Sequence, residues 1–200
     1  MAIKTVDGRG LACPKPVLET KKALENLTGE TLITLVDNAI AVENVKKLLT
    51  KLSYSFEVTT KDDYFEIKIL NTKGEIQSME TVEEKSLKDQ SILFTSNKIG
   101  KGDDTLGQVL MKGYIYTLSE MTELPKYIMF VNSGVELTTK GSESIDDLKA
   151  LEDRGVEILS CGTCLDYLSI DLSDLAVGSV TNMYTIVDNT TNVKNTLTIG

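Results

Sequence analysis

Three cysteines are the residues of this sequence best suited to chemistry: Cys13 near one end of the chain, and Cys161 and Cys164 near the other. Histidine is absent, which excludes Ser-His-Asp and Cys-His catalysis and Cys/His zinc fingers. An activated thiol must therefore depend on backbone dipoles, on Lys or Arg, or on another thiol. Three cysteines make no disulfide framework. They are either reactive thiols or buried apolar side chains.

Cys13 is followed by Pro14, and proline favours the first position of a helix because its missing N–H would be unpaired there. Cys13 is therefore expected at or beside the N-cap, although Pro16 disfavours helical geometry at Lys15 and could delay the helix by one turn. A helix terminus offers an anion roughly 0.3–1 kcal/mol, which is less than one pKa unit. Arg9 and Lys15 could add to this. We expect a modestly activated thiol that attacks a persulfide and passes the sulfur on. A structural cysteine is the alternative.

Cys161 and Cys164 flank Gly162 and Thr163 directly after an apolar segment, at the edge of a sheet where sites occur. A structural zinc site would need two further ligands, which the neighbourhood does not supply. A thioredoxin-like motif usually comes early in its domain, whereas this pair comes late. Disulfide redox chemistry stays open, as do two buried structural thiols. We favour chalcogen handling, in which one thiol holds sulfur or selenium and the other resolves it.

The elements that would position Cys13 follow a β-α-β-α-β-β pattern over the first 70 residues. The strands alternate apolar and polar residues, and the helices repeat apolar residues every three or four positions. Strands are expected at 3–6, 31–36, 56–60 and 65–69, and helices at about 14–27 and 39–52. Two helices on one face of a four-stranded sheet make a two-layer sandwich.

The second half of the chain alternates strands with helices. Residues 71–88 are polar and aperiodic, and we interpret them as a linker before a domain at 89–200. Strands are expected near 91–95, 127–131, 156–160 and 196–199, with helices near 105–121, 142–154 (capped by Ser142) and 181–188. This order predicts parallel crossovers and a three-layer α/β/α sheet. Its sites are expected in the loops after the strands, at 96–103, 132–141 and 160–166.

The charge and the apolar content of the chain disfavour some classes of function. The net charge of −9 arises in residues 71–200, which hold 11 basic and 20 acidic residues, whereas residues 1–70 hold ten of each. No basic stripe is present, which disfavours nucleic-acid binding. No apolar run approaches the ~20 residues that span a bilayer, and the first residues lack the apolar stretch of a signal peptide. We expect a cytoplasmic protein that binds neither nucleic acid nor membrane.

The segment around Cys13 resembles a known family. Asp7-x-Arg9-Gly10-Leu11-x-Cys13-Pro14-x-Pro16, followed by Lys21 and Ala23, is similar to the TusA/SirA-like sulfur-carrier family over residues 1 to about 70. The resemblance implies that Cys13 carries sulfur as a persulfide, which it receives from a cysteine desulfurase or another donor and passes to a protein acceptor. The residues that support the motif would be Asp7, Arg9, Gly10, Pro14, Lys15 and Pro16.

Residues 89–200 resemble a DsrE-like domain. The resemblance rests on Gly102-Asp103-x-x-Leu106-Gly107-x-x-Leu110-Met111, Val131-Asn132-Ser133-Gly134-Val135 and Cys161-Gly162-Thr163-Cys164. It implies a flavodoxin-like sheet, a sulfur-carrying Cys161 and association of copies through this domain. Cys164 lies outside the general pattern of that family.

The two domains together resemble the YedF-type proteins, which are sulfurtransferase-like and linked to selenium metabolism. That resemblance implies a carrier that holds sulfur or selenium covalently on cysteine, with no bound cofactor or metal. Two alternatives remain open. One is a thiol-disulfide redox protein that uses Cys161 and Cys164, and the other is a non-catalytic docking or regulatory module.

Overall fold

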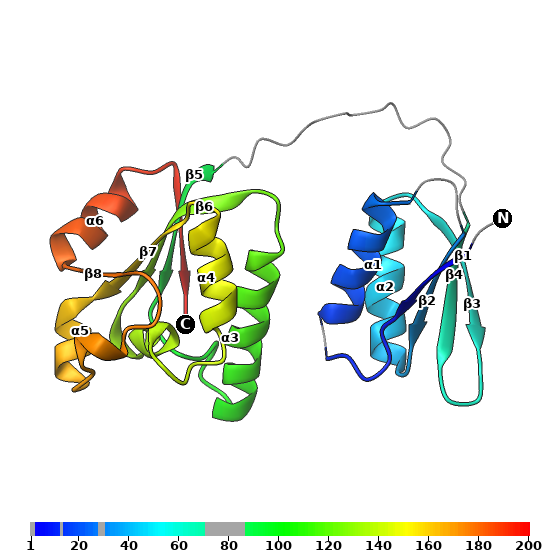
Figure 1. The fold of residues 1–200 in the computed structure, drawn as a ribbon, viewed down its shortest axis with the longest axis horizontal. Coiled ribbons are helices and arrows are strands. Elements are labelled where there is room, and N and C mark those ends of the chain that lie inside the picture. Colours follow the sequence, from blue (N-terminus) through cyan, green and yellow to red (C-terminus); the bar gives the residue numbers. More distant parts are fainter. Residues whose placement is uncertain (1–2, 13, 28–30, 71–86) are drawn as a thin grey trace. The chain divides into compact units, whose positions relative to one another are not determined.

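The chain forms two compact units, residues 1–80 and 81–200, each of which is described here by itself. The computed structural model describes residues 3–12, 14–27, 31–70 and 87–200 (Figure 1). Most of the expected linker at 71–88 lies outside the described residues. Its last two residues, Leu87 and Lys88, belong instead to the first strand of the second unit, because they pair with Leu124 and Pro125 of the neighbouring strand.

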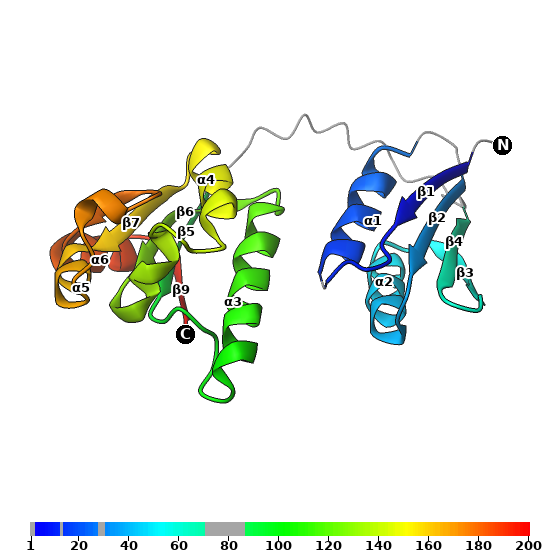
Figure 2. The same cartoon turned by 60° about the horizontal axis from the view of Figure 1, so that its bottom comes forward.

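The first unit is the expected two-layer sandwich. Its elements are β1 (Ile3–Asp7), α1 (Lys15–Glu25), β2 (Thr31–Val36), α2 (Ala39–Lys51), β3 (Ser55–Thr60) and β4 (Phe65–Leu70). The sheet order is β1-β2-β4-β3, in which only β1 and β2 pair in parallel. Both helices cover the same face of the sheet (Figures 1 and 2). The core between the layers is formed by Ala23, Leu24, Leu32, Val36, Ala41, Val42, Val45, Leu49, Ile67 and Ile69.

The start of α1 differs from the sequence prediction by one residue. Pro14 is the N-cap rather than the first helical residue, and its carbonyl accepts the backbone N–H groups of Val17 and Leu18. Pro16 occupies the second helical position, where a missing N–H costs no hydrogen bond. The helix is fixed to the sheet by Thr20, whose hydroxyl donates to the Pro16 carbonyl and lies 3.1 Å from the Thr34 hydroxyl.

The second unit is the expected three-layer α/β/α domain, with a flavodoxin-like sheet of five strands. The sheet order is β8-β7-β6-β5-β9 and every pair is parallel. Helices α3 and α4 lie on one side of the sheet, and α5 and α6 lie on the other (Figures 1 and 2). The elements are β5 (Leu87–Phe94), α3 (Asp104–Ser119), β6 (Leu124–Phe130), the 3-10 helix η1 (Asn132–Thr138), α4 (Ile145–Asp153), β7 (Glu157–Cys161), α5 (Gly162–Tyr167), the 3-10 helix η2 (Leu172–Asp174), β8 (Ser179–Thr181), α6 (Met183–Thr191) and β9 (Asn195–Ile199).

Two boundaries in this unit correct the sequence prediction. Ser142 does not cap α4, which begins at Ile145 after Ser144; the Ser142 hydroxyl instead accepts the Ser144 N–H in the preceding turn. Helix α6 begins at Met183, because Asn182 caps it by accepting the Thr185 N–H. The three residues of β8 just before it form an edge strand that the periodicity of the sequence did not indicate.

Two stacked aromatic side chains lie in the core of the second unit where β5 and β6 end. Phe94 and Phe130, the last residues of these strands, are fully buried and stack with ring centroids 5.0 Å apart. Tyr114 of α3 meets Phe94 edge-on at 5.8 Å. Aromatic pairs in these geometries add roughly 0.5–1.5 kcal/mol beyond burial. The loops that leave these strands therefore start from a rigid base.

Candidate functional site

The connection from β1 to α1 carries the sequence motif of the first thiol. Cys13 itself lies outside the described residues, so the site is built from its neighbours. The Lys15 N–H donates to the Ala12 carbonyl over 3.0 Å. Ala12 and Lys15 are exposed, whereas Pro16 is buried against the sheet. The described residues that flank Cys13 thus lead from β1 on one side and into the first turn of α1 on the other.

Arg9 is held by Asp7 at the end of β1. Its Nε lies 2.9 Å from Oδ1 of Asp7 and its Nη2 lies 2.7 Å from Oδ2, and the guanidinium also stacks 5.2 Å from the ring centroid of Tyr64. This two-pronged hydrogen bond lowers the pKa of Asp7 to about 2. Since both charges are already paired, Arg9 contributes less to a nearby thiolate than the sequence alone suggested.

Gly10 ties the same connection to the start of α2. Its φ of +70° lies in the left-handed region that glycine adopts freely. Its N–H donates to Oδ2 of Asp37 over 2.6 Å, and the Asn38 amide donates to the other oxygen over 2.9 Å. The Gly10 hydrogen bond is the main reason that the pKa of Asp37 is lowered. Asn38 in turn caps α2 by accepting the Ala41 N–H.

Asp37 and Asn38 are support residues that the sequence analysis did not single out. The signal was an Asp-Asn pair directly before an apolar-periodic helix, which is typical of an N-cap. Their contact with Gly10 spans 27 residues of sequence, so its role in the Cys13 connection could not be deduced from spacing.

An apolar cavity of about 320 Å³ opens beside this connection, at the starts of α1 and α2. Its walls are Leu11, Ala12, Pro16, Val17, Asn38, Ile40, Ala41 and Asn44. The cavity adjoins the neighbours of Cys13 on both sides, and Ile40 leaves 73% of its surface exposed. A wall of this kind suits the approach of an apolar surface to the thiol.

The second unit brings Cys161 and Cys164 together as free thiols. Cys161 ends β7, where its Cα pairs with Thr181 of β8, and it is only 2% exposed. Cys164 lies in the first turn of α5 and is partly exposed. Gly162 permits this arrangement, because a Cβ there would approach Val180 to 3.0 Å. The pair therefore consists of one buried thiol and one that solvent reaches.

A backbone N–H points at the more accessible thiol. The Asn132 N–H donates to Sγ of Cys164 over 3.1 Å, and Asn132 has a φ of +52°, which is uncommon outside glycine. Burial and a hydrogen bond with Cys161 raise the pKa of Cys164, while the Asn132 N–H opposes that rise. Cys164 is therefore predominantly a thiol at neutral pH, with one donor in place for its anion.

Strand pairing explains why Asn132 reaches Cys164. Phe130 at the end of β6 pairs with Ser160 near the end of β7, so the residues that follow meet at one edge of the sheet. The loops at 132–141 and 160–166 were expected from the sequence to share this edge. Asn132 was visible only as part of the Val131–Val135 segment that carries a family resemblance, and no feature of the sequence indicated a hydrogen bond from its N–H to a thiol.

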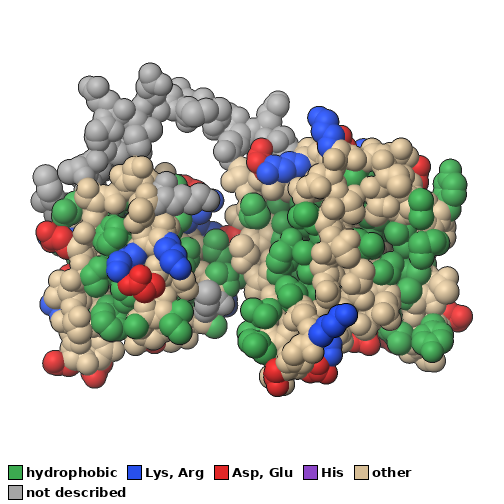
Figure 3. Space-filling model, turned by 180° about the vertical axis from the view of Figure 1, so that it is seen from behind, with side chains coloured by type: hydrophobic (Ala, Val, Ile, Leu, Met, Phe, Trp, Pro, Cys, Tyr) green, Lys and Arg blue, Asp and Glu red, His purple; other side chains and the backbone are tan. Residues whose placement is uncertain are grey.

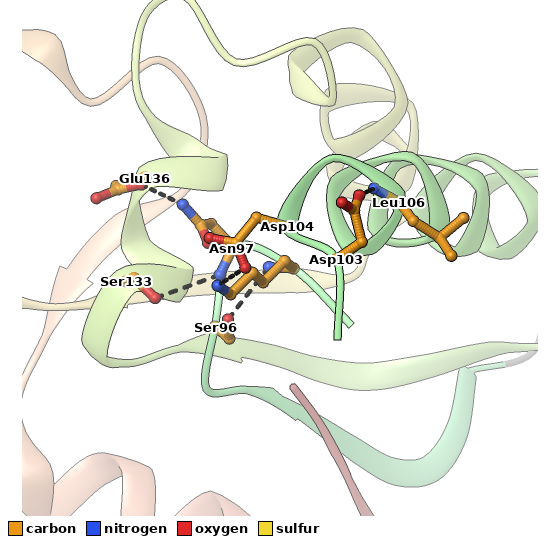
Figure 4. Close-up of polar contacts among 8 residues, drawn as sticks. Ser96, Asn97, Asp103, Asp104, Leu106, Ser133 and Glu136 are labelled. Atoms are coloured by element: carbon orange, nitrogen blue, oxygen red, sulfur yellow. Dashed lines mark hydrogen bonds and ion pairs between the residues drawn. The ribbon is translucent and has the colours of Figure 1, made fainter. Parts of the chain in front are cut away.

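The position of Asn132 depends on η1, which is fixed from both sides. The loop after β5 holds it through Asn97, whose N–H donates to the Ser133 hydroxyl over 3.4 Å and whose amide donates to Glu136 over 2.6 Å (Figure 4). From β7, the Ser160 hydroxyl lies 2.8 Å from that of Thr138. Figure 4 also shows Asp103, which begins α3 by accepting the Leu106 N–H.

Gly134 lets η1 lie this close to β5. A Cβ at Gly134 would stand 2.7 Å from the carbonyl oxygen of Phe94, which is closer than real side chains come. That carbonyl also accepts the Val131 N–H over 2.9 Å, so it cannot easily move away. Glycine is therefore required for the packing that positions Asn132.

A larger, polar cavity of about 590 Å³ lies between α3 and the segment after η1. Asn97, Lys112, Glu136 and Lys140 are among its lining residues, and no cysteine lines it. It is thus separate from the thiol pair.

The described residues contain no group of three or more Cys, Asp or Glu side chains arranged to hold a metal ion. Within the same residues, no helix has both the length and the apolar character to cross a membrane. On the face shown in Figure 3, Lys and Arg side chains are scattered, and exposed apolar side chains lie in several groups on the larger unit. Around α5, β8 and α6 the exposed apolar residues are Tyr167, Val180, Met183, Tyr184 and Val187.

Comparison with known proteins places the first unit in a family. Residues 4–71 match the family described as Sulfurtransferase TusA. A "Putative sulfur carrier protein" of Methanocaldococcus jannaschii is 45% identical over 56 residues, which are 28% of this chain and 75% of that protein. A protein of the same description from Thermotoga maritima is 40% identical over 52 residues, which are 26% of this chain and 66% of that protein.

Three solved structures are similar to parts of the chain. A SirA-like protein from Desulfitobacterium hafniense is 36% identical and covers 34% of this chain and 96% of its own, with a TM-score of 0.33. The ychN protein from E. coli is 18% identical and covers 55% of this chain and 99% of its own, with a TM-score of 0.39. A protein of unknown function from Methanobacterium thermoautotrophicum is 17% identical and covers 55% and 97%, with a TM-score of 0.41.

Proposed function

The chain belongs, through residues 4–71, to the Sulfurtransferase TusA family, and on that premise we propose that it carries sulfur as a persulfide on Cys13. The observation that carries this proposal is the Cys13-Pro14-Lys15-Pro16 sequence at the start of α1, within the matched segment. The surroundings support it. Exposed neighbours, a first helical turn and an apolar cavity suit a thiol that exchanges its cargo with partner proteins.

The transfer needs only thiol chemistry. The Cys13 thiolate attacks the outer sulfur of a persulfide on a donor such as a cysteine desulfurase. A sulfur–sulfur bond forms at Cys13 as the bond in the donor breaks, and the donor cysteine leaves as a thiolate. The same exchange with an acceptor thiol then unloads the protein. Neither transfer changes the total number of persulfides, so no cofactor is required.

We further propose that selenium is an alternative cargo. This rests on the resemblance of the two-domain chain to YedF-type proteins, with a DsrE-like second unit that offers Cys161 and Cys164 as a second thiol site. A selenopersulfide forms and exchanges by the same displacement as a persulfide, so the thiols themselves do not distinguish the two elements. The donor and the acceptor would select the cargo.

Intact mass spectrometry of the full chain tests this proposal. The chain is incubated with a cysteine desulfurase and either cysteine or selenocysteine. A Cys161→Ser/Cys164→Ser variant, which keeps Cys13 as its only thiol, is expected to gain one sulfur or one selenium. The matched Cys13→Ala/Cys161→Ser/Cys164→Ser variant is expected to gain nothing. Absence of any gain on the variant that retains Cys13 would overturn carrier function at this residue.

A second candidate function is thiol-disulfide redox chemistry at Cys161 and Cys164. The observation that favours it is the placement of two free thiols three residues apart, one at the N-cap and one in the first turn of α5. A redox protein of this kind would form its disulfide under mild oxidant and would exchange it with a dithiol partner whether or not a persulfide is present. Oxidative titration of the Cys13→Ala chain, without any sulfur donor, measures this directly.

A further inference from the structure

The two thiols of the second unit differ in access, and their roles follow from that difference. We propose that Cys164 accepts the chalcogen and that Cys161 then expels it, releasing hydrosulfide or hydroselenide and leaving a Cys161–Cys164 disulfide. This rests on the proposed function in that a persulfide must be supplied. It adds an activity, because the chain would convert carried sulfur into free sulfide rather than only hand it on.

Access assigns the acceptor role to Cys164. A donor persulfide must reach the attacking sulfur atom, and Cys161 is only 2% exposed at the end of a central strand, whereas Cys164 is partly exposed on α5. The Asn132 N–H adds a donor 3.1 Å from Sγ of Cys164. Such a donor stabilises the sulfur anion during attack. The family resemblance pointed to Cys161 as the carrier, and the geometry points to Cys164.

Proximity assigns the resolving role to Cys161. Cys161 is the N-cap of α5 and Cys164 lies three residues later in the first turn of that helix, so the two thiols are neighbours at one helix start. Cys161 is held there by its pairing with Thr181 in β8. Because a resolving thiol attacks within the same protein, it needs no access to solvent. Its burial therefore protects it from competing donors without removing it from the reaction.

The release step balances in atoms and electrons. The Cys161 thiolate attacks Sγ of the Cys164 persulfide, a bond forms between the two Sγ atoms, and the bond to the outer sulfur breaks. The outer sulfur leaves with the bonding electron pair as hydrosulfide. The outer sulfur is reduced and the Cys161 sulfur is oxidised, while Sγ of Cys164 exchanges one sulfur–sulfur bond for another. A dithiol reductant, of either small-molecule or thioredoxin type, must then reduce that disulfide before another cycle.

This order is the reverse of the usual Cys-x-x-Cys arrangement at a helix start. There the first cysteine attacks and the second, more buried cysteine resolves. Here the first cysteine ends β7, is paired with β8 and is buried, while the second is partly exposed in the first turn of α5. The reversal follows from the burial of Cys161 at the end of β7 and the partial exposure of Cys164 on α5, and it separates this proposal from thioredoxin-like chemistry.

The test uses the full chain with Cys13→Ala, so that only the C-terminal pair can react. The reduced protein is mixed with freshly prepared glutathione persulfide, and released sulfide is measured together with the mass of the Cys161–Cys164 peptides. We expect one sulfide per chain and loss of two hydrogens from the pair. Adding a dithiol reductant should then allow repeated turnover. The Cys13→Ala/Cys161→Ser/Cys164→Ser variant gives the background.

Two further variants separate the roles of the thiols. With Cys161→Ser added, the persulfide should remain on Cys164 and the rate of sulfide release should fall at least about tenfold, because the intramolecular attack is lost. With Cys164→Ser added instead, neither persulfide nor sulfide above background is expected. Equal persulfide formation on Cys161 in that variant, or persistence of the persulfide when both cysteines are present, would overturn the proposal.

A measurement without substitution in the pair guards against misfolded variants. In the reduced Cys13→Ala chain, limited alkylation should modify Cys164 before Cys161. Labelling of Cys161 first would contradict the assignment whatever the variants do. Because glutathione persulfide replaces the desulfurase, this test is independent of whether Cys13 is loaded by a protein donor. Failure of Cys13 loading overturns the carrier proposal, and failure here overturns only the release step.

Discussion

The two thiol sites of this chain are built in opposite ways. Around Cys13 the described residues form paired charges, a helix start and an apolar cavity that faces outward. Around Cys161 and Cys164 the walls are a strand end, an edge strand and a 3-10 helix, with one thiol almost fully buried. The first arrangement suits exchange between proteins. The second suits a reaction completed inside one protein, where the leaving group is small enough to escape.

The largest effect is expected when the packing of the second site is disturbed and the first site is left unchanged. Gly134→Ala would place a Cβ 2.7 Å from the Phe94 carbonyl. Overpacking of this kind typically costs about 1–3 kcal/mol, so we expect the second unit to unfold at lower denaturant concentration. Sulfide release should also slow, because η1 carries the Asn132 N–H.

Gly113→Ala is the matched control for this substitution. Gly113 lies in the interior of α3, and a Cβ there meets nothing within 4 Å. Replacing a helical glycine by alanine should stabilise the unit by roughly 0.5–1 kcal/mol. Denaturant unfolding of both variants measures the contrast. Equal stability of the Gly134→Ala protein and the wild type would show that η1 can move away from β5 at no cost.

The two thiols of the second site should also differ in their rates of alkylation. In the native Cys13→Ala chain, Cys164 should be alkylated at least about tenfold faster than Cys161, since each 1.4 kcal/mol of local opening is a factor of ten. The pKa of Cys164 is raised from 9.0 by burial and by Cys161. Its alkylation rate should therefore still be increasing above pH 9. A plateau below that pH would contradict the direction of the shift.

The raised pKa of Cys164 also predicts a pH dependence of stability. Because the folded state holds the proton more tightly than the unfolded state, this contribution is complete below the ordinary thiol pKa. It is lost as the pH rises through the folded value. Comparing the unfolding of the reduced Cys13→Ala chain and its Cys164→Ser derivative from pH 7 to pH 10 measures the difference. The gap between them should change only at the alkaline end.

The smallest expected effect lies in the first unit. Asp7 has its pKa lowered to about 2 by the Arg9 guanidinium. Its contribution to stability is present above the ordinary Asp value of about 3.9 and is lost as the pH falls toward 2. In Arg9→Gln the pKa should return toward the ordinary range, as NMR titration of the Asp7 carboxyl would show. Because both groups are exposed, the loss of stability at neutral pH should be small.

The sequence predicted more of the fold than of the second site. Alternation and helical periodicity were enough for both sheets, because long apolar-patterned segments determine their own secondary structure. The strand Ser179–Thr181 was missed, since three residues are too few to show a period. Cys161 and Cys164 were visible as a motif. Their unequal burial was not, because it depends on where the fold places each thiol: Cys161 at the end of β7, paired with β8, and Cys164 on α5.

Sequence patterns also could not identify the backbone N–H groups that donate hydrogen bonds in the two sites. The Asn132 N–H reaches Cys164 because β6 and β7 pair in register and because Asn132 adopts a positive φ. Every residue except proline carries a backbone N–H, so the residue type at position 132 does not indicate this contact. The same holds for the Gly10 N–H on Asp37, which joins segments 27 residues apart. In both sites, the candidate thiols could be named from the sequence, and the backbone groups around them could not.

The central claim is that one thiol site carries the cargo and the other releases it. The most direct test loads the full wild-type chain with a desulfurase and cysteine, removes the desulfurase and the cysteine, and follows the added sulfur by peptide mapping over time. We expect sulfur to leave the Cys13 peptide while sulfide and the Cys161–Cys164 disulfide appear in equal amounts. Sulfur that stays on Cys13 as long as it does in the Cys161→Ser/Cys164→Ser variant would contradict it.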